Sequence, residues 1–283
     1  MTRPDKAKKG RNLHTETAAP LAGRVALVTG GGRGIGRSAA WELAALGASV
    51  AILARSEEET GQVARELSGA GYQALAVRAD VSNWGDVAEA VRAAEAALGP
   101  IAILVNNAAI LGPLAPTAAT GPTLWARTME VNITGAYHCI RAVLPGMQQR
   151  GWGRIVNITS GAGRGSGIEN AGAYSVSKAA LDMLTRAVAG ETTHPGVRVN
   201  GVSPGIVDTD MQVALRAAPT EEIGAATSER FHGFHARGEL QTPALPARLI
   251  AAVILSDMHG ETISIREERA QTLFALLPDN NVS

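Results

Sequence analysis

Two residues with complementary proton chemistry, Tyr174 and Lys178, stand four positions apart in the stretch AGAYSVSKAAL. Residues i and i+4 lie on one face of an α-helix, so a helix here would place the phenol beside the ammonium. A free tyrosine has a pKa of about 10, and a nearby fixed cation favours the phenolate. The pair is therefore a candidate general acid and base near neutral pH. An amphipathic helix with a core tyrosine and a surface lysine has the same spacing.

Other polar residues stand where short aliphatic runs end. Ser160 ends the run RIVNITS, Asn106 ends the run IAILVN, and Thr209 follows the run VRVNGVS. Asn132 lies in the helical stretch between the first two of these runs. Open α/β sheets bind ligands at the carboxyl ends of their strands. Each residue alone could serve a turn or a cap, but their joint placement predicts one site.

A glycine-rich turn, VTGGGRGIGRS, follows the first aliphatic run and opens a helical stretch. Gly30, Gly34 and Gly36 would let backbone N–H groups and a helix N-terminus approach a pyrophosphate. The spacing is not the strict G-x-G-x-x-G fingerprint. The turn predicts a dinucleotide site, although glycine also serves tight turns and close packing.

Two arginines favour a cofactor with a 2′-phosphate. NAD-binding chains usually end the second strand with a carboxylate for the ribose. Here that strand ends in Ala54 and Arg55, the first acid is Glu57, and Arg33 lies inside the glycine turn. Guanidinium groups bind phosphate through bidentate, charge-assisted bonds. The alternative is that both arginines are solvated surface residues.

Short aliphatic runs alternate with longer amphipathic stretches along the chain, and this alternation predicts the strands and helices that must position these residues. Non-alternating aliphatic runs are typical of strands covered on both faces, and strand alternating with helix indicates a doubly wound sheet. We therefore predict an α/β fold with one Rossmann-type domain and a mostly parallel sheet of about seven strands. The predicted strands are 25–29, 49–53, 73–77, 101–105, 154–158, 197–202 and 261–265.

No linker or composition break divides residues 21–270, so we expect one domain there. We expect residues 1–20, which have no hydrophobic pattern, to be a disordered tail. The less regular segment at about 208–245 has the character of a substrate loop or lid. Residues 271–283 are expected to form a C-terminal tail.

Composition narrows the class of protein. Lys plus Arg and Asp plus Glu both count 26, so no bulk charge favours nucleic acid or an anionic membrane. The aliphatic run 249–255 is far shorter than the ~20 residues of a membrane span, and the N-terminus has no secretory apolar region. We expect a soluble, cytoplasmic protein, a buried Cys139, and no metal site at His232 and His235.

Taken together, TGGGRGIG, NNAA, VNITG, Ser160, YSVSK and SPGIVDT resemble the short-chain dehydrogenase/reductases of the classical type. Within this family, the chain is similar to the subgroup of 3-oxoacyl-carrier-protein reductases. The resemblance extends from about Leu21 to Met211. It implies an oxidoreductase that interconverts a ketone or aldehyde and an alcohol with a nicotinamide dinucleotide.

The resemblance also implies roles for a catalytic tetrad. Tyr174 would exchange a proton with the substrate oxygen, and Ser160 would hydrogen-bond the same oxygen. Lys178 would hold the nicotinamide ribose hydroxyls and lower the pKa of Tyr174. Asn132 would hold a water that links Lys178 to solvent.

The remaining residues that the resemblance implies contact the cofactor. The pyrophosphate would be surrounded by Gly30, Ile35 and the other loop glycines, the adenine would be met by Asp80, and the adenosine ribose by Asn106 and Ala108. Thr209 would hold the carboxamide. The full predicted cofactor set comprises Gly30, Arg33, Gly34, Ile35, Gly36, Arg55, Asp80, Val81, Asn106, Ala108, Tyr174, Lys178, Pro204, Gly205, Val207 and Thr209.

Two departures from the family pattern stand out: Ala109 replaces the last glycine of the asparagine-asparagine-alanine-glycine motif, and the usual glycine-rich closing segment is replaced by REERAQTLFALLPDNNVS. We predict preference for NADP(H), with NAD(H) possible, and a homodimer or homotetramer that pairs through helices near 133–149 and 174–191. The alternatives are an NAD-dependent alcohol dehydrogenase and a non-catalytic dinucleotide-binding regulator.

Overall fold

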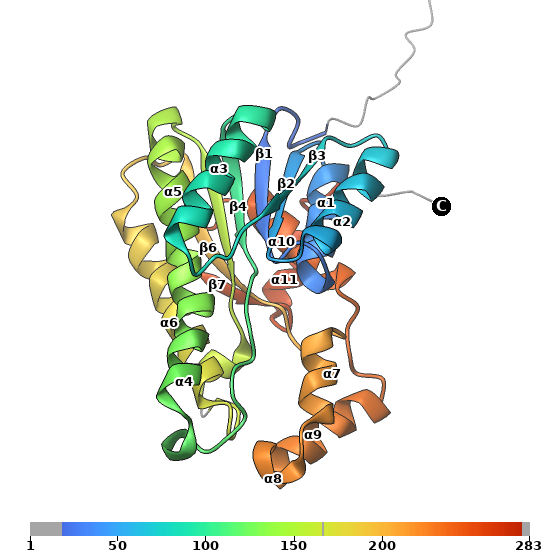
Figure 1. The fold of residues 1–283 in the computed structure, drawn as a ribbon. Coiled ribbons are helices and arrows are strands. Elements are labelled where there is room, and N and C mark those ends of the chain that lie inside the picture. Colours follow the sequence, from blue (N-terminus) through green and yellow to red (C-terminus); the bar gives the residue numbers. More distant parts are fainter. Residues whose placement is uncertain (1–18, 166, 279–283) are drawn as a thin grey trace, which may run out of the picture.

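The fold is built on one parallel sheet, seen in a computed structural model that describes residues 19–165 and 167–278. Its order is β3-β2-β1-β4-β5-β6-β7 (Figure 1). The seven strands match the predicted runs to within one residue at either end, and the doubly wound α/β prediction is confirmed. They are β1 (Val25–Thr29), β2 (Ser49–Ala54), β3 (Ala74–Arg78), β4 (Ile101–Asn106), β5 (Gly153–Ile158), β6 (Val197–Ser203) and β7 (Thr262–Ser264).

Helices cover both faces of this sheet. Side chains of α1, α2, α10 and α11 join one buried apolar cluster, and those of α3, α5 and α6 join the other. The bounds are α1 (Gly34–Ala45), α2 (Glu57–Gly69), α3 (Trp84–Leu98), α4 (Pro122–Met129), α5 (Gly135–Arg150), α6 (Gly172–Glu191), α7 (Asp210–Ala217), α8 (Thr220–Ile223), α9 (Ala225–Ala236), α10 (Ala244–Leu255) and α11 (Glu268–Phe274).

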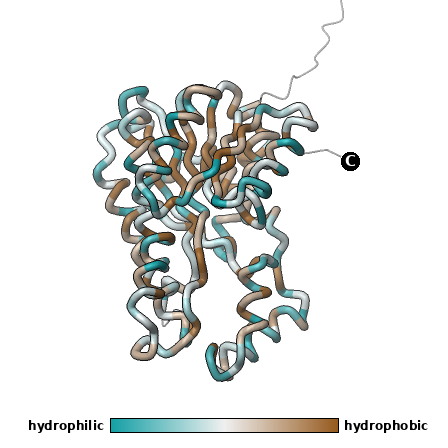
Figure 2. The backbone as a smooth tube through the Cα atoms, viewed as in Figure 1, coloured by the Kyte–Doolittle hydropathy of each residue, from teal (hydrophilic) through white to brown (hydrophobic). Residues whose placement is uncertain are grey.

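The central strands are buried on both sides, which explains their lack of alternation. Every residue of β1 and β4 is buried, and the strands are mostly brown, the hydrophobic end of the scale, in Figure 2. Cys139 belongs to this core as predicted: it is fully buried, and burial raises the pKa of its thiol to about 12. No helix among the described residues is long and apolar enough to cross a membrane.

The segment predicted as a substrate loop folds into three helices, α7 to α9, set apart from the sheet (Figure 1). Its apolar side chains Ile223 and Phe231 are buried against Leu111, Leu114 and Ile168, which belong to loops after β4 and β5. We refer to α7–α9 as the lid helices. They have their own small core, which is why this irregular sequence is ordered.

The C-terminus differs from its prediction as a tail beginning at residue 271. Helix α11 packs on α10, and Ala270, Leu273 and Leu277 are buried in the core cluster on that face of the sheet. The apolar residues in QTLFALL therefore close the core instead of trailing from it. Residues 279–283, and most of the predicted tail 1–20, lie outside the described residues.

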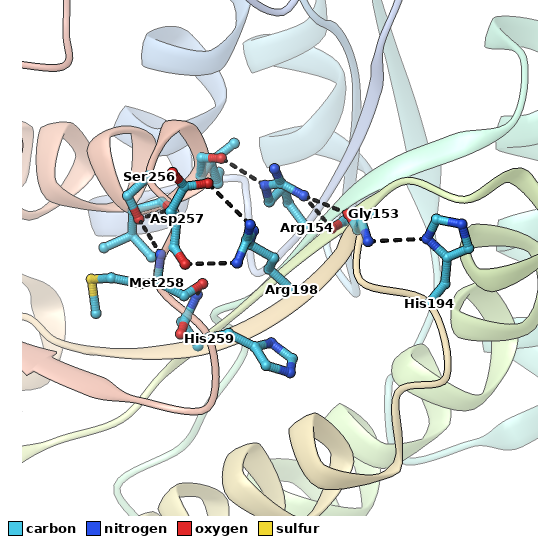
Figure 3. Close-up of polar contacts among 12 residues, drawn as sticks. Gly153, Arg154, His194, Arg198, Ser256, Asp257, Met258 and His259 are labelled. Carbon is cyan, nitrogen blue, oxygen red and sulfur yellow. Dashed lines mark hydrogen bonds and ion pairs between the residues drawn. The ribbon is translucent and has the colours of Figure 1, made fainter.

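A network of arginines holds the amino-terminal edge of the sheet, shown in Figure 3. Arg154 donates from Nε to the Ile254 carbonyl in the last turn of α10 (2.9 Å) and from Nη1 to the Gly196 carbonyl (2.8 Å). Arg198 pairs with the Asp257 carboxylate at 3.0 Å. A guanidinium at a helix C-terminus satisfies its free carbonyl groups. Burial lowers the pKa of Arg154 to about 10.

Candidate active site

A cleft of about 910 Å³ lies at the carboxyl ends of the strands. Its walls come from four places: the glycine turn before α1, the ends of β2 to β6, the start of α6, and the lid helices α7 and α9. Since β1 and β4 are neighbours with crossovers running in opposite directions, this is the switch point where doubly wound folds bind ligands.

The glycine turn is shaped for close approach of backbone to backbone. Gly30 has a φ of +62°, and a Cβ on Gly36 would stand 2.2 Å from the Gly30 carbonyl oxygen. Helix α1 begins directly after Arg33, with no side-chain cap on its first N–H groups and no acid in its first turn. Such an uncapped N-terminus beside a cleft fits a pyrophosphate.

Hydrogen bonds of Thr29 and Asn107 connect the glycine turn to the end of β4. The Thr29 hydroxyl accepts from the backbone N–H groups of Asn107 (3.0 Å) and Ala108 (3.1 Å). The Asn107 amide donates to the carbonyls of Thr29 (3.0 Å) and Gly30 (3.1 Å). These bonds fix the wall of the cleft. Neither Thr29 nor the structural role of Asn107 was predicted from the sequence.

Asn106, predicted to meet the adenosine ribose, does not line the cleft. It is buried, and its amide donates to the Asn157 side chain at 2.9 Å and toward the Ala136 carbonyl at 3.4 Å. Asn157 in turn donates to the Thr185 hydroxyl at 2.9 Å. The asparagine side chain thus links β4, β5 and α6 inside the core. The cleft wall at this point is formed by Asn107 and Ala108.

Ser160, Tyr174 and Lys178 line the same cleft. Helix α6 places the phenol and the ammonium on one face, as their spacing predicts, with Lys178 Nζ 5.7 Å from the centroid of the Tyr174 ring. Lys178 is only 3% exposed and donates to the Ile158 carbonyl at 2.7 Å. Because an ammonium carries three donors, two remain for other partners.

The pKa of Tyr174 does not behave as the resemblance implies. Burial raises the pKa of this phenol, and hydrogen bonding with Ser160 only partly opposes the effect. Burial also lowers the pKa of Lys178 to about 8, while the charge of Asp182 acts to raise it. Lys178 is not among the groups that shift the pKa of Tyr174, and the largest effect, burial, acts opposite to the expected lowering.

Asn132 lies in a π-helical turn, Glu130–Thr134, between α4 and α5. Its amide accepts from the Ile110 N–H (2.8 Å) and donates to the Ile110 carbonyl (2.9 Å) and to Ser177 (3.0 Å). Single π turns within helices recur at functional sites. Asn132 stands behind the cleft wall and joins the loop after β4 to α6, next to Lys178.

Arg33 and Arg55, the two arginines predicted to bind a 2′-phosphate, both line the cleft. Arg55 is exposed and lines the cleft. Arg33 pairs with Asp210 at 2.8 Å and lies 3.9 Å from Glu59. Neither ion pair was predicted, since nothing local in the sequence marks a pairing of the glycine turn with Glu59 on α2 or with Asp210 on α7. Ser56 caps α2 by accepting from the Glu59 N–H at 3.2 Å.

Asp80, predicted to meet the adenine, also lines the cleft. Its carboxylate accepts from the Ser82 hydroxyl at 2.7 Å and pairs with Arg127 at 2.7 Å. Burial alone would raise the pKa of Asp80, but these bonds outweigh it and lower the pKa to about 2. Arg127 was not predicted, because it lies 47 residues away from its partner.

The structure gathers most of the predicted site around one cleft. Only Gly36, Asn106 and Asn132 lie outside its lining. The predicted residues that line it are Gly30, Arg33, Gly34, Ile35, Arg55, Asp80, Val81, Ala108, Ser160, Tyr174, Lys178, Pro204, Gly205, Val207 and Thr209.

Known proteins share both the sequence pattern and the fold. The family described as short chain dehydrogenase matches residues 24–220. A putative ketoacyl reductase of Streptomyces coelicolor is 37% identical over 235 residues, which make up 81% of this chain and 89% of that protein. A variant of actinorhodin polyketide ketoreductase, solved with NADPH, is 34% identical, with 85% of this chain and 95% of that chain covered and a TM-score of 0.78. An NAD+-bound xylitol dehydrogenase is 28% identical, with coverages of 87% and 98% and a TM-score of 0.79.

Proposed function

Since the chain belongs to the short chain dehydrogenase family and is an oxidoreductase of CH–OH or carbonyl groups, we propose that it prefers NADP(H) and uses Tyr174 as general acid and base. The observation that carries the proposal is that Ser160, Tyr174 and Lys178 line the same cleft as the glycine turn. When bound there, the dinucleotide supplies or accepts the hydride. The substrate is a small ketone, aldehyde or alcohol, and the protein is a cytoplasmic homo-oligomer.

Four side chains position the substrate and transfer the proton. The Ser160 hydroxyl donates to the substrate oxygen and stabilises the charge that develops on it. Tyr174 gives its phenolic proton to that oxygen during reduction and takes it back during oxidation. Lys178 uses the donors left free by Ile158 to hold ribose hydroxyls and to stabilise the phenolate. Asn132, through Ser177, fixes the turn of α6 that carries both groups.

The proposed cofactor preference rests on the positive charges of two arginines in the cleft lining. Arg55 lies in the lining and Arg33 lies at the start of α1, so a 2′-phosphate would meet two guanidinium groups. One observation favours the alternative of NAD(H): Arg33 already pairs with Asp210. That pair is exposed, however, and exposed ion pairs contribute only about 0–1 kcal/mol, so a phosphate can compete for the arginine.

The test measures kcat/KM for a panel of ketones, aldehydes and alcohols with NADP(H) and with NAD(H). We expect turnover with a higher kcat/KM for NADP(H). Arg55→Asp should move the preference toward NAD(H), whereas Arg65→Asp, at an exposed residue of α2 outside the cleft, should not. A higher kcat/KM with NAD(H) in the unaltered protein would contradict the preference. Binding of NADPH without turnover of any compound would favour the non-catalytic regulator.

A further inference from the structure

Two polar side chains in the cleft lining have a buried atom without a partner among the described residues: Thr159, directly before Ser160, and Gln212, on the lid helices. Gln212, in the first turn of α7, lines the cleft and is only 9% exposed. Its Oε1 is buried, and no described residue donates a hydrogen bond to it. A buried acceptor without a donor destabilises the protein, so it is expected where a bound molecule supplies that donor.

The neighbouring Arg216 does not satisfy this acceptor. It lies one helical turn further along α7, and its buried Nη1 also has no partner among the described residues. The two groups are not hydrogen-bonded to each other, and only Gln212 lines the cleft. The amide is therefore available to a ligand.

Apolar side chains connect Tyr174 with the lid helices that carry Gln212. Leu111 and Ile168 pack against Tyr174 on one side and against Leu215 and Phe231 of the lid helices on the other. Met211, beside Gln212 in the chain, packs against the Tyr174 cluster. A molecule whose carbonyl reaches Tyr174 thus contacts these apolar side chains, and the unpartnered acceptor of Gln212 belongs to the same lining. A charged donor would lose its hydration there at a high cost.

We propose that the substrate carries an uncharged hydrogen-bond donor, a hydroxyl or an amide N–H, on an otherwise apolar body, and that Gln212 accepts a hydrogen bond from it. The inference rests on the proposed function, because it assumes that the substrate carbonyl meets Ser160 and Tyr174. It makes Gln212 a specificity residue in the lid. A site built around a polar group rejects analogues that lack its partner more strongly than an apolar pocket rejects a change of one methylene.

The experiment compares ketones that differ only by a hydroxyl or a methyl group of similar size. The probes are 3-hydroxy- and 4-hydroxycyclohexanone, each matched with its methyl analogue, with NADPH as reductant. The variant Gln212→Met keeps the length of the side chain and removes the acceptor. Val213→Ala, on the exposed side of the same helix, is the matched control. Thermal shifts of the NADP+ complex with the same ketones measure binding without turnover.

We expect the unaltered protein and Val213→Ala to favour the hydroxy over the methyl compound by about 10-fold or more in at least one pair. In Gln212→Met the ratio should fall to about one or reverse, mainly through KM, with the Kd for NADPH unchanged. The proposal is overturned if both ratios are the same in Gln212→Met as in the unaltered protein. It is also overturned if the variant changes only the NADPH affinity or only the melting temperature. Absence of turnover with every ketone speaks against the proposed function instead, while the thermal shifts still test Gln212.

Discussion

Tyr174 and Lys178 are both buried, and burial acts on each pKa in the direction of the neutral form. It raises the pKa of the phenol and lowers that of the ammonium to about 8. A neutral phenol is the form that donates a proton to a carbonyl oxygen. A charged lysine is the form that stabilises the phenolate left behind. The neutral phenol and the charged lysine are therefore both present below a pH of about 8.

The first prediction is that reduction and oxidation respond oppositely to pH. Because the raised pKa keeps the proton on Tyr174, carbonyl reduction should be nearly constant below pH 8 and fall above it, as Lys178 loses its charge. Alcohol oxidation needs the phenol deprotonated, so its kcat/KM should increase from pH 6 through neutrality. Profiles of kcat/KM in both directions provide the measurement. A reduction rate that increases with pH between 7 and 9 would contradict the assignment.

The second prediction concerns the phenol itself. Tyr174→Phe removes the proton donor and keeps the ring, so kcat should fall by about 10²–10⁴-fold. NADPH affinity should hardly change, because Lys178 and the glycine turn remain. Fluorescence titration of NADPH, paired with turnover of any active substrate, gives both quantities. Turnover at the unaltered rate would make Tyr174 a packing residue.

At the scale of elements, the sequence predicted most of the sheet because its strands are covered on both faces. Continuous aliphatic runs such as VALVT locate such strands without reference to their neighbours. The lid helices were harder to predict, because their order depends on contacts between Phe231 and loops more than sixty residues earlier. Residues that act through such distant contacts, including Asn107 and Arg127, carry no local signal.

Helix α11 was the clearest miss, and it leads to the third prediction. Leu273 is 8% exposed and packs in the core, whereas Leu276 on the same segment is 46% exposed. Leu273→Ala should lower the free energy of unfolding by about 2 kcal/mol or more, because it leaves a cavity. Leu276→Ala should change it by less than about 0.5 kcal/mol. Denaturant unfolding of both variants is the check, and equal stability of the two would mean that the segment does not close the core.

At the scale of the whole molecule, the predicted site residues converge because strand ends of a parallel sheet share one edge. That rule placed Ser160 and Thr209 correctly in the cleft lining. It failed for Asn106, whose side chain turns into the core to bond Asn157. The position of a residue at a strand end is therefore predictable from the sequence. The direction of its side chain depends on partners across the sheet.

At the same scale, the exposed apolar side chains on α5 and α6 predict that the protein assembles. Several large apolar side chains are exposed on the helices expected to pair subunits, notably Tyr137 on α5 and Val176 and Met183 on α6. Val176 and Met183 are seven residues apart and 49% and 58% exposed, so they lie on one face of α6. Apolar groups grouped in this way favour burial against a second copy.

The last prediction is that the protein is at least a dimer at micromolar concentration and that Met183→Glu weakens the dimer. The substitution would place a carboxylate in an apolar contact, where desolvation costs free energy without a partner to offset it. Leu276→Glu is the control, because Leu276 is exposed to a similar degree on a segment outside the expected interface. Light scattering across a dilution series should show the dissociation constant of the Met183 variant increased by at least about 10-fold, which corresponds to about 1.4 kcal/mol. A monomeric unaltered protein would refute the assembly, and equal effects of the two glutamates would move the interface away from α6.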